Sequence, residues 1–103
     1  NYPPFCDIIL IRFNGKNLSE IQKVSLKMYN ALNSILDKKK NILYKPVPAP
    51  VDKIQNKYRY RMILKGKVNL KLIDCIKYSM EENVIGKIKD TTITVDINPN
   101  NMI

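Results

Sequence analysis

The spacing of the hydrophobic residues changes along this chain, and these changes limit its fold more than any single motif does. Residues 6–13 form an aliphatic run between prolines and an Asn-Gly pair, with the length and β-branched composition of a buried strand. Further on, apolar residues recur at steps of three and four, which predicts one face of an amphipathic helix. The residues of that face are Leu18, Ile21, Val24, Met28, Leu32 and Ile35.

Local signals indicate where this helix begins and ends. Ser19 with Gln22 has the spacing of a capping box, and Asn17 with Glu20 is an alternative, so the helix should begin here. The lysines at positions 38–40 suit the negative end of a helix dipole, and we expect the helix to end there.

The middle of the chain predicts two more strands. Residues 41–47 have the composition of a strand, but the prolines at positions 46, 48 and 50 lack backbone donors and impose an extended path. This segment should therefore lie at a sheet edge or form a rigid crossover. Residues 58–65 are expected to form a strand with Tyr58 and Tyr60 on one face and the intervening arginines on the other.

A second helix and a last strand are expected in the final third of the chain. Asn69 is a good N-cap, and the helix should run to about Asn83. Residues 91–97 are expected to form the last strand, before the Asn-Pro-Asn stop. The side chains expected to face inward from the helix are Leu70, Ile73, Ile76 and Met80.

The resulting order β-α-β-β-α-β indicates an α+β fold, in which two helices cover one face of a four-stranded sheet. A chain of 103 residues has the size of one domain, so residues 1–103 are treated as a single domain. The longest aliphatic run, residues 8–11, is far too short to cross a membrane. The chain begins with Asn rather than Met, and we expect it to be a piece of a longer protein.

The net charge of +9, from 18 basic and 9 acidic residues, favours a polyanionic partner such as nucleic acid or an acidic protein tail. Cations alternate with aromatic residues around positions 57–61, and a strand places residues of one face about 7 Å apart. That interval is similar to the spacing of phosphates along a nucleic-acid strand. The candidate anion-binding residues are Lys57, Arg59, Arg61 and Lys65.

Two alternatives remain open for Tyr58 and Tyr60. Exposed tyrosines beside these cations would stack on bases. Alternatively, both rings face the helices and belong to the core, which is the interpretation that we prefer.

The sequence offers little for catalysis, metal binding or ATP binding. It contains no histidine, which removes the commonest general base and the commonest metal ligand. Its Gly-Lys pairs lack the earlier glycine and the following Ser or Thr of a P-loop. Cys6 and Cys75 are expected to be reduced thiols of a cytosolic protein. We therefore assign no catalytic residue, no metal site and no cofactor to this chain.

Several short motifs occur in the order that is typical of one family. They are Tyr2-Pro3-Pro4-Phe5 before the first strand, Pro48-Ala49-Pro50, Tyr58-Arg59-Tyr60, and Asp96-Ile97-Asn98-Pro99 followed by Met102. Together they resemble the C-terminal domain of primosomal protein N′, the replication-restart helicase PriA of bacteria. The resemblance extends over nearly the whole chain.

The resemblance implies a four-stranded α+β domain similar to a small-subunit ribosomal protein. It also implies an accessory role in an ATP-dependent 3′–5′ DNA helicase of the bacterial cytoplasm and nucleoid, whose ATP, magnesium and zinc are bound by other domains. The implied partners are branched or single-stranded DNA, the single-stranded-DNA-binding protein, the preceding helicase lobes and other primosome proteins. Tyr2, Pro3, Pro4 and Phe5 would form the junction to the preceding lobe.

The chain departs from the family pattern at two positions. The family usually ends in Asp-Val-Asp-Pro, whereas Asn98 replaces the second acid here, so a cation site that needs two carboxylates is in doubt. Asp96 is then expected to bond backbone near Pro99 or to pair with a lysine. Arg61 stands where the family commonly has Gln, which makes this strand more basic.

Two other functions remain as alternatives. In the first alternative, the domain is a structural spacer that orients the helicase lobes, and its basic face serves solubility. Less in keeping with the motifs, it would be a free-standing RNA-binding or ribosomal protein.

Overall fold

The computed structural model describes residues 7–54, 56–83 and 90–99. Five strands and two helices follow one another along the chain. They are β1 (Asp7–Gly15), α1 (Leu18–Ile35), β2 (Ile42–Leu43), β3 (Val47–Ile54), β4 (Lys57–Gly66), α2 (Leu70–Asn83) and β5 (Thr92–Ile97).

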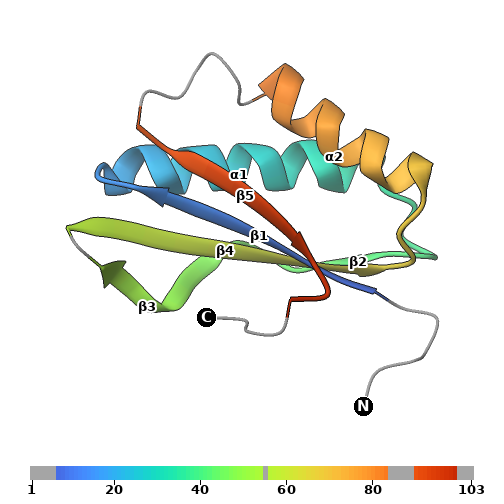
Figure 1. Ribbon diagram of the computed structural model, residues 1–103. Helices are drawn as coiled ribbons and strands as arrows, with labels where there is room; N and C mark the ends of the chain where they lie inside the picture. Colours follow the sequence, from blue (N-terminus) through green and yellow to red (C-terminus); the bar gives the residue numbers. More distant parts are fainter. Residues whose placement is uncertain (1–6, 55, 84–89, 100–103) are drawn as a thin grey trace.

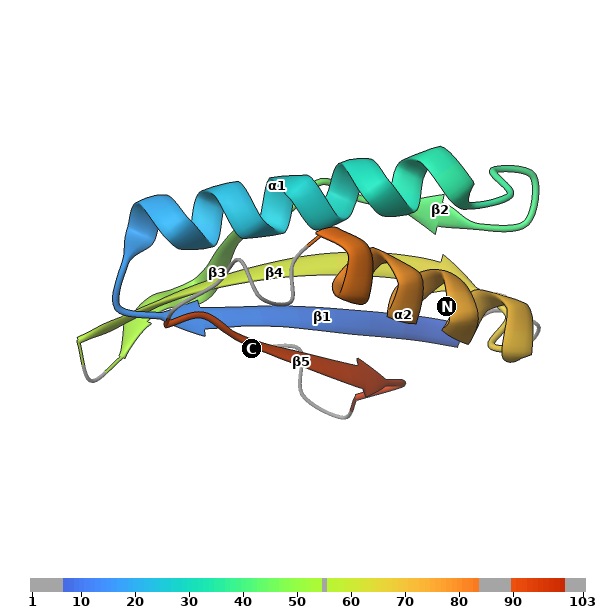
Figure 2. The same ribbon diagram turned by 90° about the horizontal axis from the view of Figure 1, so that it is seen from above.

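The five strands form one antiparallel sheet with β4 and β1 at its centre (Figure 1). The strand order is β2-β4-β1-β5, and β3 pairs with β4 beyond the end of β2. β2 and β3 therefore share one edge of the sheet, and β5 forms the other. Both helices lie on the same side of the sheet, as the two views show (Figures 1 and 2).

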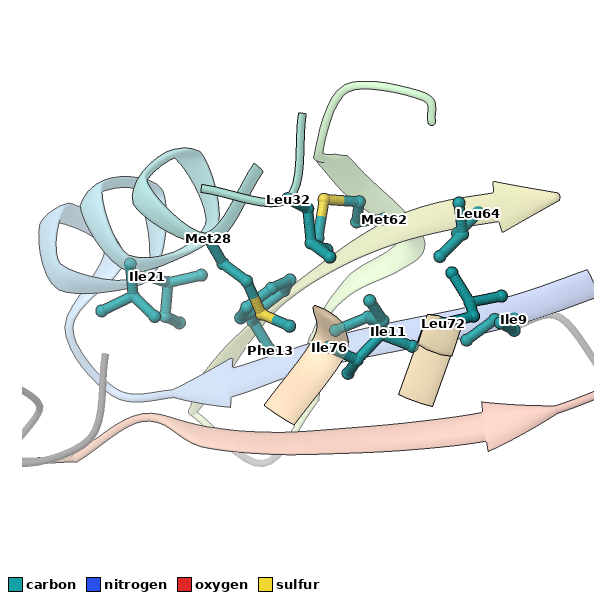
Figure 3. Packing of buried hydrophobic residues seen from close by; sticks show 11 residues of the cluster. Ile9, Ile11, Phe13, Ile21, Met28, Leu32, Met62, Leu64, Leu72 and Ile76 are labelled. Atoms are coloured by element: carbon teal, nitrogen blue, oxygen red, sulfur yellow. The ribbon is translucent and has the colours of Figure 1, made fainter. Parts of the chain in front are cut away.

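The hydrophobic core lies between the sheet and the helices (Figure 3). Alternate residues of β1 and β4 point toward α1, as the period of two in a strand requires. The α+β class that the sequence predicted is confirmed. The buried residues of this core are Ile9, Ile11, Phe13, Ile21, Val24, Met28, Leu32, Met62, Leu64, Leu72 and Ile76.

Helix α1 begins where the sequence indicated but ends earlier than expected. Asn17 is its N-cap, and the Asn17 side chain accepts a hydrogen bond from the backbone N–H of Glu20. The helix ends at Ile35, before the lysines at 38–40. Asp37 accounts for this difference, because its carboxylate accepts from the backbone N–H of Lys39 at 3.0 Å and its carbonyl accepts from two further residues. These local bonds form a turn in competition with the helix.

Of the strand expected at residues 41–47, the structure has the two-residue β2, and the proline segment that begins at Val47 forms a further strand, β3. The prediction of four strands was therefore wrong. β2 has two residues, and β3 contains the prolines at positions 48 and 50. β3 is an edge strand, one of the two alternatives for this segment, and its pairing with β4 shifts register between Pro48 and Lys53. Proline is tolerated there because an edge strand needs only some of its backbone donors.

The N-cap predicted for α2 is present, but the inward face was predicted incompletely. Asn69 accepts from the backbone N–H of Leu72 at 2.8 Å. Leu70, expected in the core, is 79% exposed, and Leu72 is buried in its place. The buried face therefore runs from Leu72 through Ile76 to Met80, in steps of four.

In the described part of the chain, neither helix is both long enough and apolar enough to cross a membrane. Cys75 is a free, half-buried thiol, whereas Cys6 lies outside the described residues.

Candidate nucleic-acid interface

The sheet has one face against the helices and one face turned away from them, which we call the open face. Strand register determines which side chains share it, since paired residues of neighbouring strands point the same way. Leu10 lies opposite Ile63 on β4 and Asp96 on β5, and Asn14 lies opposite Arg59. The open-face residues of β1, β4 and β5 are Ile8, Leu10, Arg12, Asn14, Lys57, Arg59, Arg61, Ile63, Lys65, Thr92, Thr94 and Asp96.

All four predicted anion-binding residues belong to the open face. Lys57 is exposed, and Arg59, Arg61 and Lys65 are partly buried. Their positions follow from the alternation along β4, as the sequence indicated. Their binding of an anion stays a prediction.

The structure adds Arg12 to this group, directly opposite Arg61 in the pairing of β1 with β4. Like charges in opposed register disfavour a sheet. A carboxylate reduces the cost here, because Arg12 forms a salt bridge with Asp96 on β5. Asp96 is the one acid that β1, β4 and β5 place on the open face.

Arg12 was missed in the sequence because the run at 6–13 was interpreted as uniformly buried. The available signal was the alternation along the strand, because Arg12 is two residues from both Leu10 and Asn14 and shares their face. The partner expected for Asp96 was also wrong. Within the described residues, the partner found for Asp96 is an arginine from a distant strand rather than the local backbone or the lysine that was expected.

Tyr58 and Tyr60 lie on the helix face and pack against the core. Tyr60 is opposite Phe13, and its hydroxyl accepts a hydrogen bond from the Gln22 side chain of α1 at 3.0 Å. Both tyrosines are thus on the other side of the sheet from the arginines, which is the arrangement preferred from the sequence.

A different tyrosine occupies the open face. Tyr44 follows β2, and its backbone N–H donates to the carbonyl of Ile63 at 2.9 Å, which extends the pairing with β4. Its side chain is 45% exposed. The Lys65 amine lies over the ring, 5.4 Å from its centroid, a cation–π contact.

Asn98 joins the two ends of the described chain. Its backbone N–H donates to the Ile8 carbonyl, and its side-chain oxygen accepts from the Ile8 N–H at 2.8 Å. Its side-chain amide donates to Asp7 at 2.9 Å. Asn98 has a φ of 50°, a conformation that Asn adopts more readily than most residues.

These bonds lower the pKa of Asp7. The hydrogen bond from Asn98 is the largest cause, followed by the backbone N–H of Val68 and the positive charge of Lys67. Each of these favours the ionised carboxylate. Asn98, which stands where the family usually has its second acid, thus donates to Asp7 through its amide.

A groove of about 440 Å³ lies between the end of α1 and the start of α2. Its lining includes the apolar side chains of Leu36, Leu72 and Cys75, the acid Asp37, and three lysines. The lysines are Lys40, Lys67 and Lys71. The predicted junction, Tyr2 to Phe5, lies outside the described residues.

Comparison with known proteins gives a consistent result. Two proteins named replication restart protein PriA, from two strains of Helicobacter pylori, are 37% and 35% identical to this chain over 75 residues, or 73% of it. A protein of the same name from Synechocystis is 33% identical over 73 residues, or 71% of the chain. The chain spans 12% of the length of the Helicobacter relatives and 9% of the Synechocystis relative.

The family described as primosomal protein N C-terminal domain matches residues 1–100. This match includes the junction motif, the basic strand and the Asp-Ile-Asn-Pro segment that suggested the resemblance. The chain therefore belongs to the primosomal protein N C-terminal domain family.

Proposed function

We propose that this chain is an accessory domain of a replication-restart helicase and that its open face binds the phosphate backbone of DNA. The observation that supports this most directly is the opposed pair Arg12 and Arg61 at the sheet centre. A phosphate bound there would add to the compensation that Asp96 already gives Arg12. Arg59 and Lys65 extend the positive charge along β4.

Such contacts hold the backbone without reading the bases. Binding should be independent of sequence, and the released counterions should make it depend strongly on salt. A domain of this kind would hold branched or single-stranded DNA for the helicase lobes rather than select a site on it.

Charge reversal on the open face, compared with the same charge reversal on the helices, tests this proposal. Arg59→Glu with Arg61→Glu should abolish binding of a fluorescent single-stranded oligonucleotide at low salt, measured by anisotropy. The control Lys23→Glu with Lys77→Glu changes the net charge equally on exposed helix positions, and it should leave most of the affinity. Equal losses in both double variants would reject an open-face site. Unchanged affinity in the arginine variant would favour a spacer domain whose charge serves solubility.

A second role is favoured by the groove between α1 and α2. Its lining combines apolar residues with three lysines against one acid, Asp37, which suits an acidic peptide that has apolar residues. We therefore propose that it helps dock the acidic tail of single-stranded-DNA-binding protein. A synthetic tail peptide should bind the wild type, and Lys40→Glu with Lys71→Glu should remove this binding. Unchanged peptide affinity in that variant would reject the groove.

The remaining chemistry is assigned to other domains of the longer protein. The sequence has no P-loop, and the described residues contain no group of three side chains suited to a metal ion. We therefore propose that ATP, magnesium and zinc are bound outside this chain, together with the contacts to other primosome proteins.

A further inference from the structure

Tyr44 has the position and the environment of a base-stacking residue. Among the described tyrosines it is the one on the open face, since Tyr58 and Tyr60 pack on the helix face and Tyr29 and Tyr78 belong to the helices. Its ring is 45% exposed, next to exposed Ile42 and Val47 on the same edge of the sheet. Covering the apolar surface of a large exposed ring at a sheet edge is favourable in free energy.

The ring and its neighbours offer one contact for the base of a nucleotide and another for its phosphate. Lys65 lies over the ring, and the residue as a whole is 45% exposed, so part of the ring is accessible to a base. Ile63, opposite Tyr44, is two residues from Arg61 along β4. A diagonal pair of this kind is separated by about 7–8 Å, a distance that one nucleotide spans between its base and its phosphate.

From this arrangement we infer that Tyr44 stacks on an unpaired base of the strand whose phosphates bind at Arg59 and Arg61. This inference rests on the proposed function of the open face. It adds a preference for single-stranded over duplex nucleic acid, because the bases of a duplex are already stacked on one another. Lys65 contributes in two ways, by orienting the ring and by contacting the adjacent phosphate.

The chain contains no tryptophan, which allows a direct optical test. In the Tyr44→Trp variant, oligothymidylate should quench the indole emission, whereas an abasic oligonucleotide of the same length should not. The matched control is Tyr78→Trp, because Tyr78 is 51% exposed on α2. Its emission should respond to neither oligonucleotide.

Affinities provide a second readout. Tyr44→Ala should weaken binding of oligothymidylate by about 5- to 100-fold, the effect of losing one stacked base, and should leave binding of the abasic oligonucleotide unchanged. Tyr78→Ala should change neither. Circular dichroism of each variant checks that it is folded, and the Tyr44→Trp variant gives a result even if Tyr44→Ala unfolds.

The outcomes separate this inference from the proposed function. If the wild type binds both oligonucleotides equally and with the same salt dependence, the open face binds phosphates but Tyr44 does not stack, and the inference is wrong. Equal quenching of the two tryptophan variants would also overturn it, because the response would then not be specific to position 44. If the wild type binds neither oligonucleotide at low salt, both the inference and the proposed function fail.

Discussion

Asn98 stands where the family usually has an aspartate, and its side-chain amide can donate a hydrogen bond that a carboxylate cannot. Asn98 completes the pairing with Ile8 through its backbone and its side chain, and its amide then donates to Asp7. The hydrogen-bonded Asp7 has a lowered pKa, so its contribution to stability is present above the pKa of the unfolded chain. That contribution is lost as the pH falls through the lower pKa of the folded state.

Asn98→Asp should destabilise the domain at neutral pH, because the variant replaces the donor to Asp7 with a second carboxylate. Asp also adopts the left-handed conformation readily, so the change is mainly electrostatic. Thermal unfolding followed by circular dichroism should show a lower Tm than the wild type at about pH 7. The difference in Tm between the variant and the wild type should become smaller toward about pH 4, where carboxyl groups begin to take up protons. A gap that is independent of pH would show that repulsion between the acids is not the cause.

The connection between α1 and β5 depends on Glu20, an acid in the first turn of the helix. One oxygen of its carboxylate accepts from the backbone N–H groups of Asp90 and Thr91, both at 3.1 Å, and from the Thr91 hydroxyl at 2.7 Å. Asp90 in turn accepts from the backbone N–H of Lys16 at 2.6 Å. These bonds hold the start of β5 against the first turn of α1.

Glu20→Ala should lower the free energy of unfolding by about 1–3 kcal/mol, since it leaves the buried Thr91 and its backbone N–H without their acceptor. Glu20→Gln retains an oxygen and should lose less. Denaturant unfolding measures both. The control Glu81→Ala, at an exposed position of α2, should change stability little. If Glu20→Ala behaves like that control, the carboxylate does not hold β5.

At the level of helices and strands, local patterns predicted most of the elements but not their ends. Periodicity located both helices, and Asn17 and Asn69 were both recognisable as caps. The end of α1 was missed because the turn at Asp37 competes with the helix. The division of the second strand depends on how β2 and β3 pair with β4, and that pairing joins distant parts of the chain.

For the whole molecule, the open face illustrates what a single sequence cannot show. Alternation along one strand was enough to group Arg59 with Arg61. Alternation could have placed Arg12 on one face of β1, but its position opposite Arg61, and that of Tyr44 opposite Ile63, depend on pairing between distant strands. The salt bridge from Arg12 to Asp96 has the same origin, because it needs β1 and β5 to be neighbours.

The salt dependence of DNA binding tests the central claim, that the open face binds phosphates, most directly. If Lys57, Arg59, Arg61 and Lys65 together neutralise about four phosphates, a plot of log affinity against log salt should have a slope near −3 for single-stranded DNA. The wild type should then bind roughly 50-fold more weakly at about 200 mM than at about 50 mM salt. Arg59→Glu with Arg61→Glu should bind too weakly at either salt concentration for a slope to be measured. Affinity that does not change with salt, or a slope that this double variant leaves at the wild-type value, would contradict the account.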